Sequence, residues 1–119
     1  MPLDLQVIEY GEVQLLRITG EVDLATAPAL RSSIREIIDS HPAGLVIDLG
    51  DVPFLDSTGL GVLVAAYKQA IAAEVALCLV RPQRIVANAM ALMRISTVIP
   101  VHDTVEAGVV AMGGPSPST

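Results

Sequence analysis

The segment DVPFLDSTGLGVL, residues 51–63, joins an apolar strand to an apolar helix and so decides how this 119-residue chain folds. The strand before it, LVIDL at residues 45–49, is almost continuously apolar, which is typical of a central strand covered on both faces. From Thr58 onward, apolar residues recur at helical spacing, and this spacing places Ser57 at the expected N-terminal cap of the helix.

Ser57 is the candidate functional residue of this segment. A serine at a helix start displays its hydroxyl on a turn, beside backbone N–H groups that have no partner within the helix. The helix dipole favours negative charge there, so the position suits a phosphate, and phosphorylation would change the charge at one defined point of the surface. From the four residues DSTG alone, an ordinary cap is the more frequent explanation, because caps strongly prefer Ser and Asp.

Strands and helices alternate through the rest of the chain. Alternating apolar residues predict an antiparallel hairpin with strands at residues 3–7 and 13–18. Further strands are predicted at residues 75–80 and 98–101, and helices at residues 28–40, 58–73, 82–93 and 104–112. This order predicts an α/β fold: a mixed β-sheet with an N-terminal antiparallel hairpin and about four packed helices. Ser57 would then lie at the carboxyl end of a parallel strand, where open α/β sheets place their binding sites.

The chain reads as one domain followed by a short tail. We assign residues 1–112 to the domain, since no internal repeat or long linker divides them. Residues 113–119 consist largely of Gly, Pro and Ser and have nothing apolar to bury, so we expect a disordered C-terminal tail.

Composition excludes several classes of partner. The formal net charge of −6, from seven Lys and Arg against thirteen Asp and Glu, would repel nucleic acid, and 3% aromatic residues leave no platform for bases. No uninterrupted apolar run approaches the length of a membrane span, and no secretory signal pattern is visible, so we expect a cytoplasmic protein. Cys78 is the only cysteine and reads as a buried strand residue, while His41 and His102 lack metal-ligand spacing. We therefore expect no metal and no cofactor.

Catalysis is also disfavoured. The nucleophile elbow of hydrolases requires Gly-x-Ser-x-Gly, and Leu55 occupies the first glycine position. A phosphate-binding Gly-x-x-x-x-Gly-Lys loop is missing. A receiver domain, with Asp48 or Asp56 as its phosphorylated acid, would require paired acids after the first strand, which the chain lacks. The pattern indicates a binding module and not an enzyme.

Residues 51–63 closely resemble the signature of the STAS family, especially its bacterial anti-sigma factor antagonists. A second block, GEVDLATAPAL at residues 20–30, resembles the family's Gly-Glu-hydrophobic-Asp pattern, which a helix follows. The resemblance covers roughly residues 3 to 110 and implies a single STAS domain. It also implies that Ser57, the first hydroxyl residue of its signature, is the phosphoacceptor.

The resemblance extends to the neighbours of Ser57. It implies that Asp23 lies near the phosphoacceptor and matters for phosphorylation, although a turn-forming role would also explain an Asp there. Asp56 either orients the turn or sharpens the switch through its charge. Thr58, Gly59 and Leu60 would complete the region that contacts the partner. Gly59 and Gly61 each cost about 1 kcal/mol inside a helix, which suggests close approach by a neighbouring element or by a partner surface.

The implied partner is an anti-sigma factor with Ser/Thr kinase activity of the GHKL type. The unphosphorylated protein would sequester this kinase and free a sigma factor, the kinase would phosphorylate Ser57, and a phosphoserine phosphatase would reverse the modification. ATP would bind the partner. Alternatives are a STAS module of a stressosome-like scaffold or of a transport complex, or a small-ligand binding module.

One departure from the family pattern concerns two helix ends. The family commonly has glycine-containing turns where this chain has Ala72, Ala73 and Glu74, and again where it has residues 92–96. Since glycine permits left-handed turns, we expect these helix ends to be shaped differently.

Overall fold

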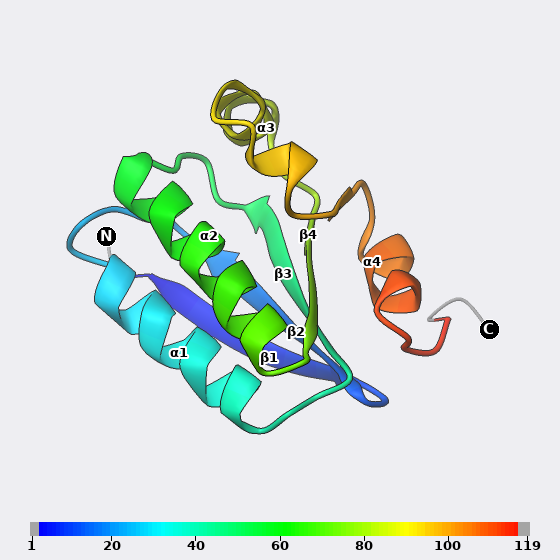
Figure 1. Ribbon diagram of the computed structural model, residues 1–119. Helices are drawn as coiled ribbons and strands as arrows, with labels where there is room; N and C mark the ends of the chain where they lie inside the picture. Colours follow the sequence, from blue (N-terminus) through cyan, green and yellow to red (C-terminus); the bar gives the residue numbers. More distant parts are fainter. Residues whose placement is uncertain (1–2, 117–119) are drawn as a thin grey trace.

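A mixed five-stranded sheet in the order β1-β2-β3-β4-β5 forms the centre of the computed structural model, which describes residues 3–116 (Figure 1). The strands are β1 (Asp4–Tyr10), β2 (Val13–Thr19), β3 (Gly44–Asp51), β4 (Ala76–Val80) and β5 (Val101–His102). The helices are α1 (Ala27–Asp39), α2 (Ser57–Ala72), α3 (Arg84–Leu92) and α4 (Val105–Ala111), with a 3₁₀ helix, η1 (Ile95–Thr97), after α3. The predicted α/β fold is confirmed.

The N-terminal hairpin is the antiparallel part of the sheet. β1 pairs antiparallel with β2 in a register that places Tyr10 opposite Val13, and Gly11 takes a φ of 61° in the turn between them. β2, β3, β4 and β5 pair in parallel, because a helix-containing connection returns the chain between each pair. The predicted hairpin is therefore confirmed.

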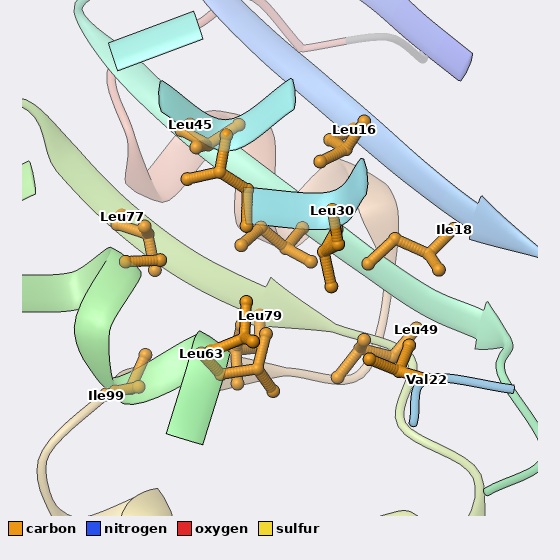
Figure 2. Packing of buried hydrophobic residues seen from close by; sticks show 14 of the residues in the cluster. Leu16, Ile18, Val22, Leu30, Leu45, Leu49, Leu63, Leu77, Leu79 and Ile99 are labelled. Carbon is orange, nitrogen blue, oxygen red and sulfur yellow. The ribbon is translucent and has the colours of Figure 1, made fainter. Parts of the chain in front are cut away.

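Two apolar clusters cover the two faces of the sheet. On one face, α1 and α2 lie side by side, and Leu30 and Leu63 from these helices meet Leu45, Leu77 and Leu79 from β3 and β4 (Figure 2). On the other face, Val109 of α4 packs with a smaller cluster that consists of Val13, Leu15, Val46, Cys78 and Val80. β3 is apolar nearly throughout because it is covered from both sides.

Cys78 is buried in the smaller cluster, as the sequence predicts. Burial raises the pKa of its thiol to about 12, so at neutral pH it is a small apolar side chain without thiolate character.

The strand predicted for residues 98–101 is wrong in most of its length. β5 begins only at Val101, and Ile99 is buried as a core residue outside any strand. Pro100 explains the difference, since it has no N–H to donate to a neighbouring strand, although its carbonyl accepts from the Leu79 N–H at 2.9 Å.

The expectation that two helix ends are shaped differently is also wrong. Glu74 and Arg94, which directly follow the C-terminal caps of α2 and α3, adopt φ values of 60° and 58°. Both helices thus end in the left-handed conformation that glycine usually supplies, although a side chain there costs about 1 kcal/mol or more.

A buried carboxylate fixes the carboxyl end of the sheet on the face opposite α1 and α2. Asp48 of β3 is fully buried and is held by two arginines from the neighbouring chain segments. Arg17 Nε lies 3.1 Å from its Oδ2 and Arg81 Nε 3.0 Å from its Oδ1. The Gly50 N–H also donates to Oδ1, at 2.9 Å. Burial alone would raise the pKa of Asp48, but the bonds from Arg81, Gly50 and Arg17 outweigh it and hold the pKa below its usual range.

The tail expected to be disordered from residue 113 is described only in part. The Gly114 N–H donates to the Val109 carbonyl at 2.9 Å. Residues 117–119 lie outside the described part of the chain, as do residues 1 and 2.

Candidate functional site

The two sequence blocks around Asp23 and Ser57 meet at one end of the sheet. Val22 forms an isolated parallel bridge with Leu55, and its N–H donates to the Phe54 carbonyl at 3.4 Å. A Cβ placed on Gly59 would lie 3.1 Å from Val22 Cγ1. Asp23 follows Val22 directly, so it is at the same end of the sheet as Ser57.

Asp56, and not Ser57, caps α2. Asp56 is extended, and its Oδ1 accepts the Gly59 N–H at 2.9 Å. The expectation that Ser57 is the cap is therefore wrong by one residue: Ser57 is the first residue of the helix. Asp56 is favoured as the cap because its carboxylate accepts the Gly59 N–H and interacts favourably with the helix dipole.

Ser57 consequently has a hydroxyl that the fold does not use. Its side chain is exposed, and within residues 3–116 its oxygen forms no hydrogen bond. Thr58 is partly buried, while Gly59 and Leu60 in the same first turn of α2 are buried. The geometry thus exposes the Ser57 hydroxyl at the start of a helix whose cap is a different residue, Asp56.

Asp23 forms a tight turn that leads into α1. Its Oδ1 accepts the N–H groups of Ala25 and Thr26, each at 3.0 Å, and the Thr26 hydroxyl at 3.2 Å. The backbone bond from Thr26 is the main cause that lowers the pKa of Asp23, so the carboxylate is charged at neutral pH. Asp23 therefore has the turn-forming role considered from the sequence, and it also lies at the end of the sheet where Ser57 is found.

Replacing Asp23 tests its role in the turn. Asp23→Asn should leave the melting temperature nearly unchanged, because an amide oxygen can accept the same two N–H groups. Asp23→Ala should lower it by a few degrees, since both N–H groups, which lie in the turn before α1, lose their partner. Thermal unfolding followed by circular dichroism measures both, and equal melting temperatures for the two variants would contradict this role.

A groove of about 380 Å³ runs beside Ser57. One wall is α2, which contributes Ser57, Leu60, Gly61 and Val64, and Met93 and Ile95 after α3 supply the other wall. Met93 was not predicted as a site residue, and neither were the two exposed apolar residues on the loops of the sequence blocks, Leu24 and Phe54. An apolar side chain inside a Pro- and Gly-containing loop is the signal that could have indicated them.

Gly59 and Gly61 occupy contrasting environments on α2. A Cβ on Gly59 would lie 2.8 Å from Leu55 Cδ2 and 3.1 Å from the Val22 carbonyl oxygen, so the predicted close approach is real at this position. A Cβ on Gly61 would meet no atom of the described residues within 4 Å. At Gly61 no described neighbouring element explains the glycine.

We therefore expect alanine at these two positions to change the stability of the protein in opposite directions. Gly59→Ala should destabilise the protein by about 1–2 kcal/mol, because the rigid Val22 backbone cannot yield. Gly61→Ala should stabilise it by about 0.5–1 kcal/mol, because alanine favours the helix and fits the open space. Urea unfolding of both variants gives the comparison, and changes of the same sign would contradict the packing described for Gly59.

The described residues contain neither a metal-binding cluster nor a membrane-spanning helix. Between residues 3 and 116, no three His, Cys, Asp or Glu side chains gather where they could hold a metal ion. In the same range, every helix is too short or too polar to cross a lipid bilayer.

The chain is similar in sequence to a known domain family and to proteins that belong to it. Residues 4–108 match the family described as the STAS domain. An anti-sigma-F factor antagonist of Mycobacterium tuberculosis is 44% identical over 63 residues, which cover 53% of this chain and 52% of the relative. The chain thus spans about half the length of that relative. An anti-sigma F factor antagonist of Paenibacillus polymyxa is 28% identical over 106 residues, 87% of this chain and 89% of the relative.

A solved structure agrees along nearly the whole chain. The crystal structure of an anti-sigma factor antagonist from Mycobacterium paratuberculosis superimposes with a TM-score of 0.86 at 29% sequence identity. The match covers 92% of this chain and 93% of that one.

Proposed function

This chain belongs to the STAS domain family, and we propose that it is an anti-sigma factor antagonist, a binding module switched by phosphorylation of Ser57. In its unphosphorylated form it sequesters an anti-sigma factor kinase of the GHKL type and so frees a sigma factor. Phosphorylation of Ser57 by that kinase ends the complex, and a phosphoserine phosphatase restores it. ATP binds the kinase, and the cycle takes place in the cytoplasm.

The observation that carries this proposal is the unused hydroxyl of Ser57, which lines a groove formed by mainly apolar residues and Lys68. Since Asp56 already caps α2, the fold does not depend on the Ser57 hydroxyl. A modification there can change binding without unfolding the protein. A phosphate at a helix N-terminus is moreover tolerated by the folded state, because the dipole and the nearby N–H groups favour negative charge.

The same charge is unfavourable in a complex. A partner that packs against Met93, Ile95 and Leu60 removes water from the groove. A serine hydroxyl tolerates this loss of water, whereas a group of charge about −1.5 to −2 next to the Asp56 carboxylate does not. Asp56 thereby makes the switch sharper.

The remaining residues of the region have supporting roles in this proposal. Asp23 holds the loop that carries the exposed Leu24 and helps to position the hydroxyl for phosphoryl transfer, a reaction that depends on geometry. Thr58, Gly59 and Leu60 shape the first turn of α2, where the partner docks. Asp23→Asn should be phosphorylated more slowly even though it folds normally, because it removes the carboxylate charge that the kinase would meet.

Affinity capture from the source organism tests the proposal. Wild-type protein as bait should recover a GHKL-type kinase that Ser57→Asp recovers poorly, because Asp adds an unpaired charge to the interface while remaining compatible with the helix start. Recovery of transport ATPase subunits or of a multi-protein scaffold, equally by both baits, would contradict the proposal and favour another STAS assembly.

A further inference from the structure

A second groove lies between α1 and α2, on the outer surface that these helices share. Arg31 and Arg35 of α1 and Gln69 of α2 supply its polar lining, and Ile34 and Val62 are among its apolar residues. Its volume of about 80 Å³ can take one side chain, whereas pockets for small ligands and cofactors measure about 300–1,000 Å³. The size points to a single side chain of a larger molecule.

The charges of this groove are unbalanced. Arg31 and Arg35 stand one helical turn apart, so their side chains share a face of α1 and repel each other. Within residues 3–116 neither forms an ion pair or hydrogen bond, and the nearby acids of the same helix, Glu36 and Asp39, pair with neither. α2 contributes only the neutral Gln69 to the polar lining. An anion between the two guanidinium groups would relieve the repulsion and gain charge-assisted hydrogen bonds.

We propose that this groove binds a carboxylate side chain, Glu or Asp, of a protein partner. Arg31 and Arg35 would hold the carboxylate through paired N–H bonds, for which the guanidinium shape is suited, and the methylene groups would pack on Ile34 and Val62. A protein is favoured over a lipid surface or nucleic acid because the net charge of −6 repels extended anionic surfaces, whereas a single acidic side chain meets only the local positive charge.

The groove adjoins the one beside Ser57 along α2. Ala65 lines both grooves, and it lies two helical turns, about 12 Å, from Ser57 along α2. Gly61, which is exposed and lacks a packing reason, lies on α2 between Ser57 and Ala65. A partner that covers Ser57 can thus cross the small residues of α2 and place an acidic residue between Arg31 and Arg35. This extension rests on the proposed function, while the carboxylate site itself can be tested separately.

A peptide titration tests the carboxylate site. The probe is an acetylated and amidated peptide of alternating Glu and Leu, added to the ¹⁵N-labelled full chain, and its control is the same peptide with Gln in place of Glu. The Glu peptide should shift the amide signals of residues 31–35 and 62–69 in a saturable way, and more weakly as salt screens the charges. The double variant Arg31→Gln/Arg35→Gln should weaken this binding by at least about tenfold.

Charge-matched controls separate the site from general electrostatics. Arg84→Gln/Arg94→Gln removes the same charge from exposed positions outside the groove and should bind the Glu peptide like wild type. The site assignment is overturned if the Gln peptide binds equally, if both double variants lose binding equally, or if phosphatidylglycerol vesicles but not the peptide bind in an Arg31- and Arg35-dependent manner.

The same titration distinguishes this inference from the proposed function. Ser57→Asp should bind the Glu peptide like wild type, because Ser57 does not line this groove. If the peptide binds in an arginine-dependent manner but affinity capture recovers no kinase, the carboxylate site is upheld and the proposed function is contradicted. If a kinase is recovered, its affinity is unchanged by Arg31→Gln/Arg35→Gln and the Glu peptide does not bind, only the assignment of the carboxylate site is overturned.

Discussion

Replacing Asp48 by alanine should lower the free energy of unfolding by about 3 kcal/mol, or the melting temperature by about 10 °C. The substitution leaves Arg17 and Arg81 without their shared carboxylate and removes the acceptor of the Gly50 N–H. We expect the lower end of the range for broken buried pairs, because the two arginine side chains are 31% and 40% exposed and can be rehydrated.

The control for Asp48 lies on the same strand. Asp51 ends β3 and is exposed, so Asp51→Ala should change stability by no more than about 0.5 kcal/mol. Urea unfolding measures both variants. A loss below 1 kcal/mol for Asp48→Ala, or an equal loss for Asp51→Ala, would contradict the structural role of the buried carboxylate.

The contribution of Asp48 also depends on pH with a definite sign. Its pKa in the folded state is lower than the value of about 4 expected in the unfolded chain, so the ionised carboxylate stabilises the fold. This stabilisation is complete above pH of about 4 and is lost as the pH falls through the lower, folded-state pKa. The stability difference between wild type and Asp48→Asn should therefore be full at neutral pH and shrink in strong acid.

The second large effect concerns the phosphoacceptor. Incubation with the cognate kinase and ATP should add one phosphate to the wild-type protein and none to Ser57→Ala. The Ser57→Ala variant should keep its melting temperature within a few degrees, because Asp56 continues to cap α2. Ser32→Ala, which removes an exposed hydroxyl from α1, should be phosphorylated like wild type. A full phosphate on Ser57→Ala, located by mass spectrometry on Thr58 or elsewhere, would refute the assignment.

The order of strands and helices could be predicted from the sequence because each element carries its own apolar period. Residues 45–49 and the helical spacing after Thr58 are local patterns, and they placed β3 and α2 to within a few residues. The cap of α2 was misplaced by one residue because Asp and Ser are both good caps, and only the backbone conformation of Asp56 decides between them.

The buried ion cluster could not be predicted in the same way. Asp48 interrupts an apolar strand, and its partners Arg17 and Arg81 are 31 and 33 positions away. No local pattern links such residues, since only the pairing of β2, β3 and β4 brings them together. The α1–α2 groove could not be predicted for the same reason: Arg31 and Val62 belong to different helices, and no local pattern specifies how these helices pack.

The proposed switch is tested most directly by the affinity of the partner kinase for two forms of this protein, unphosphorylated and phosphorylated at Ser57. Calorimetric titration should give a dissociation constant at least tenfold higher for the phosphorylated form, about 1.4 kcal/mol or more, because the phosphate must be desolvated beside Asp56. Equal dissociation constants for the two forms would contradict the account.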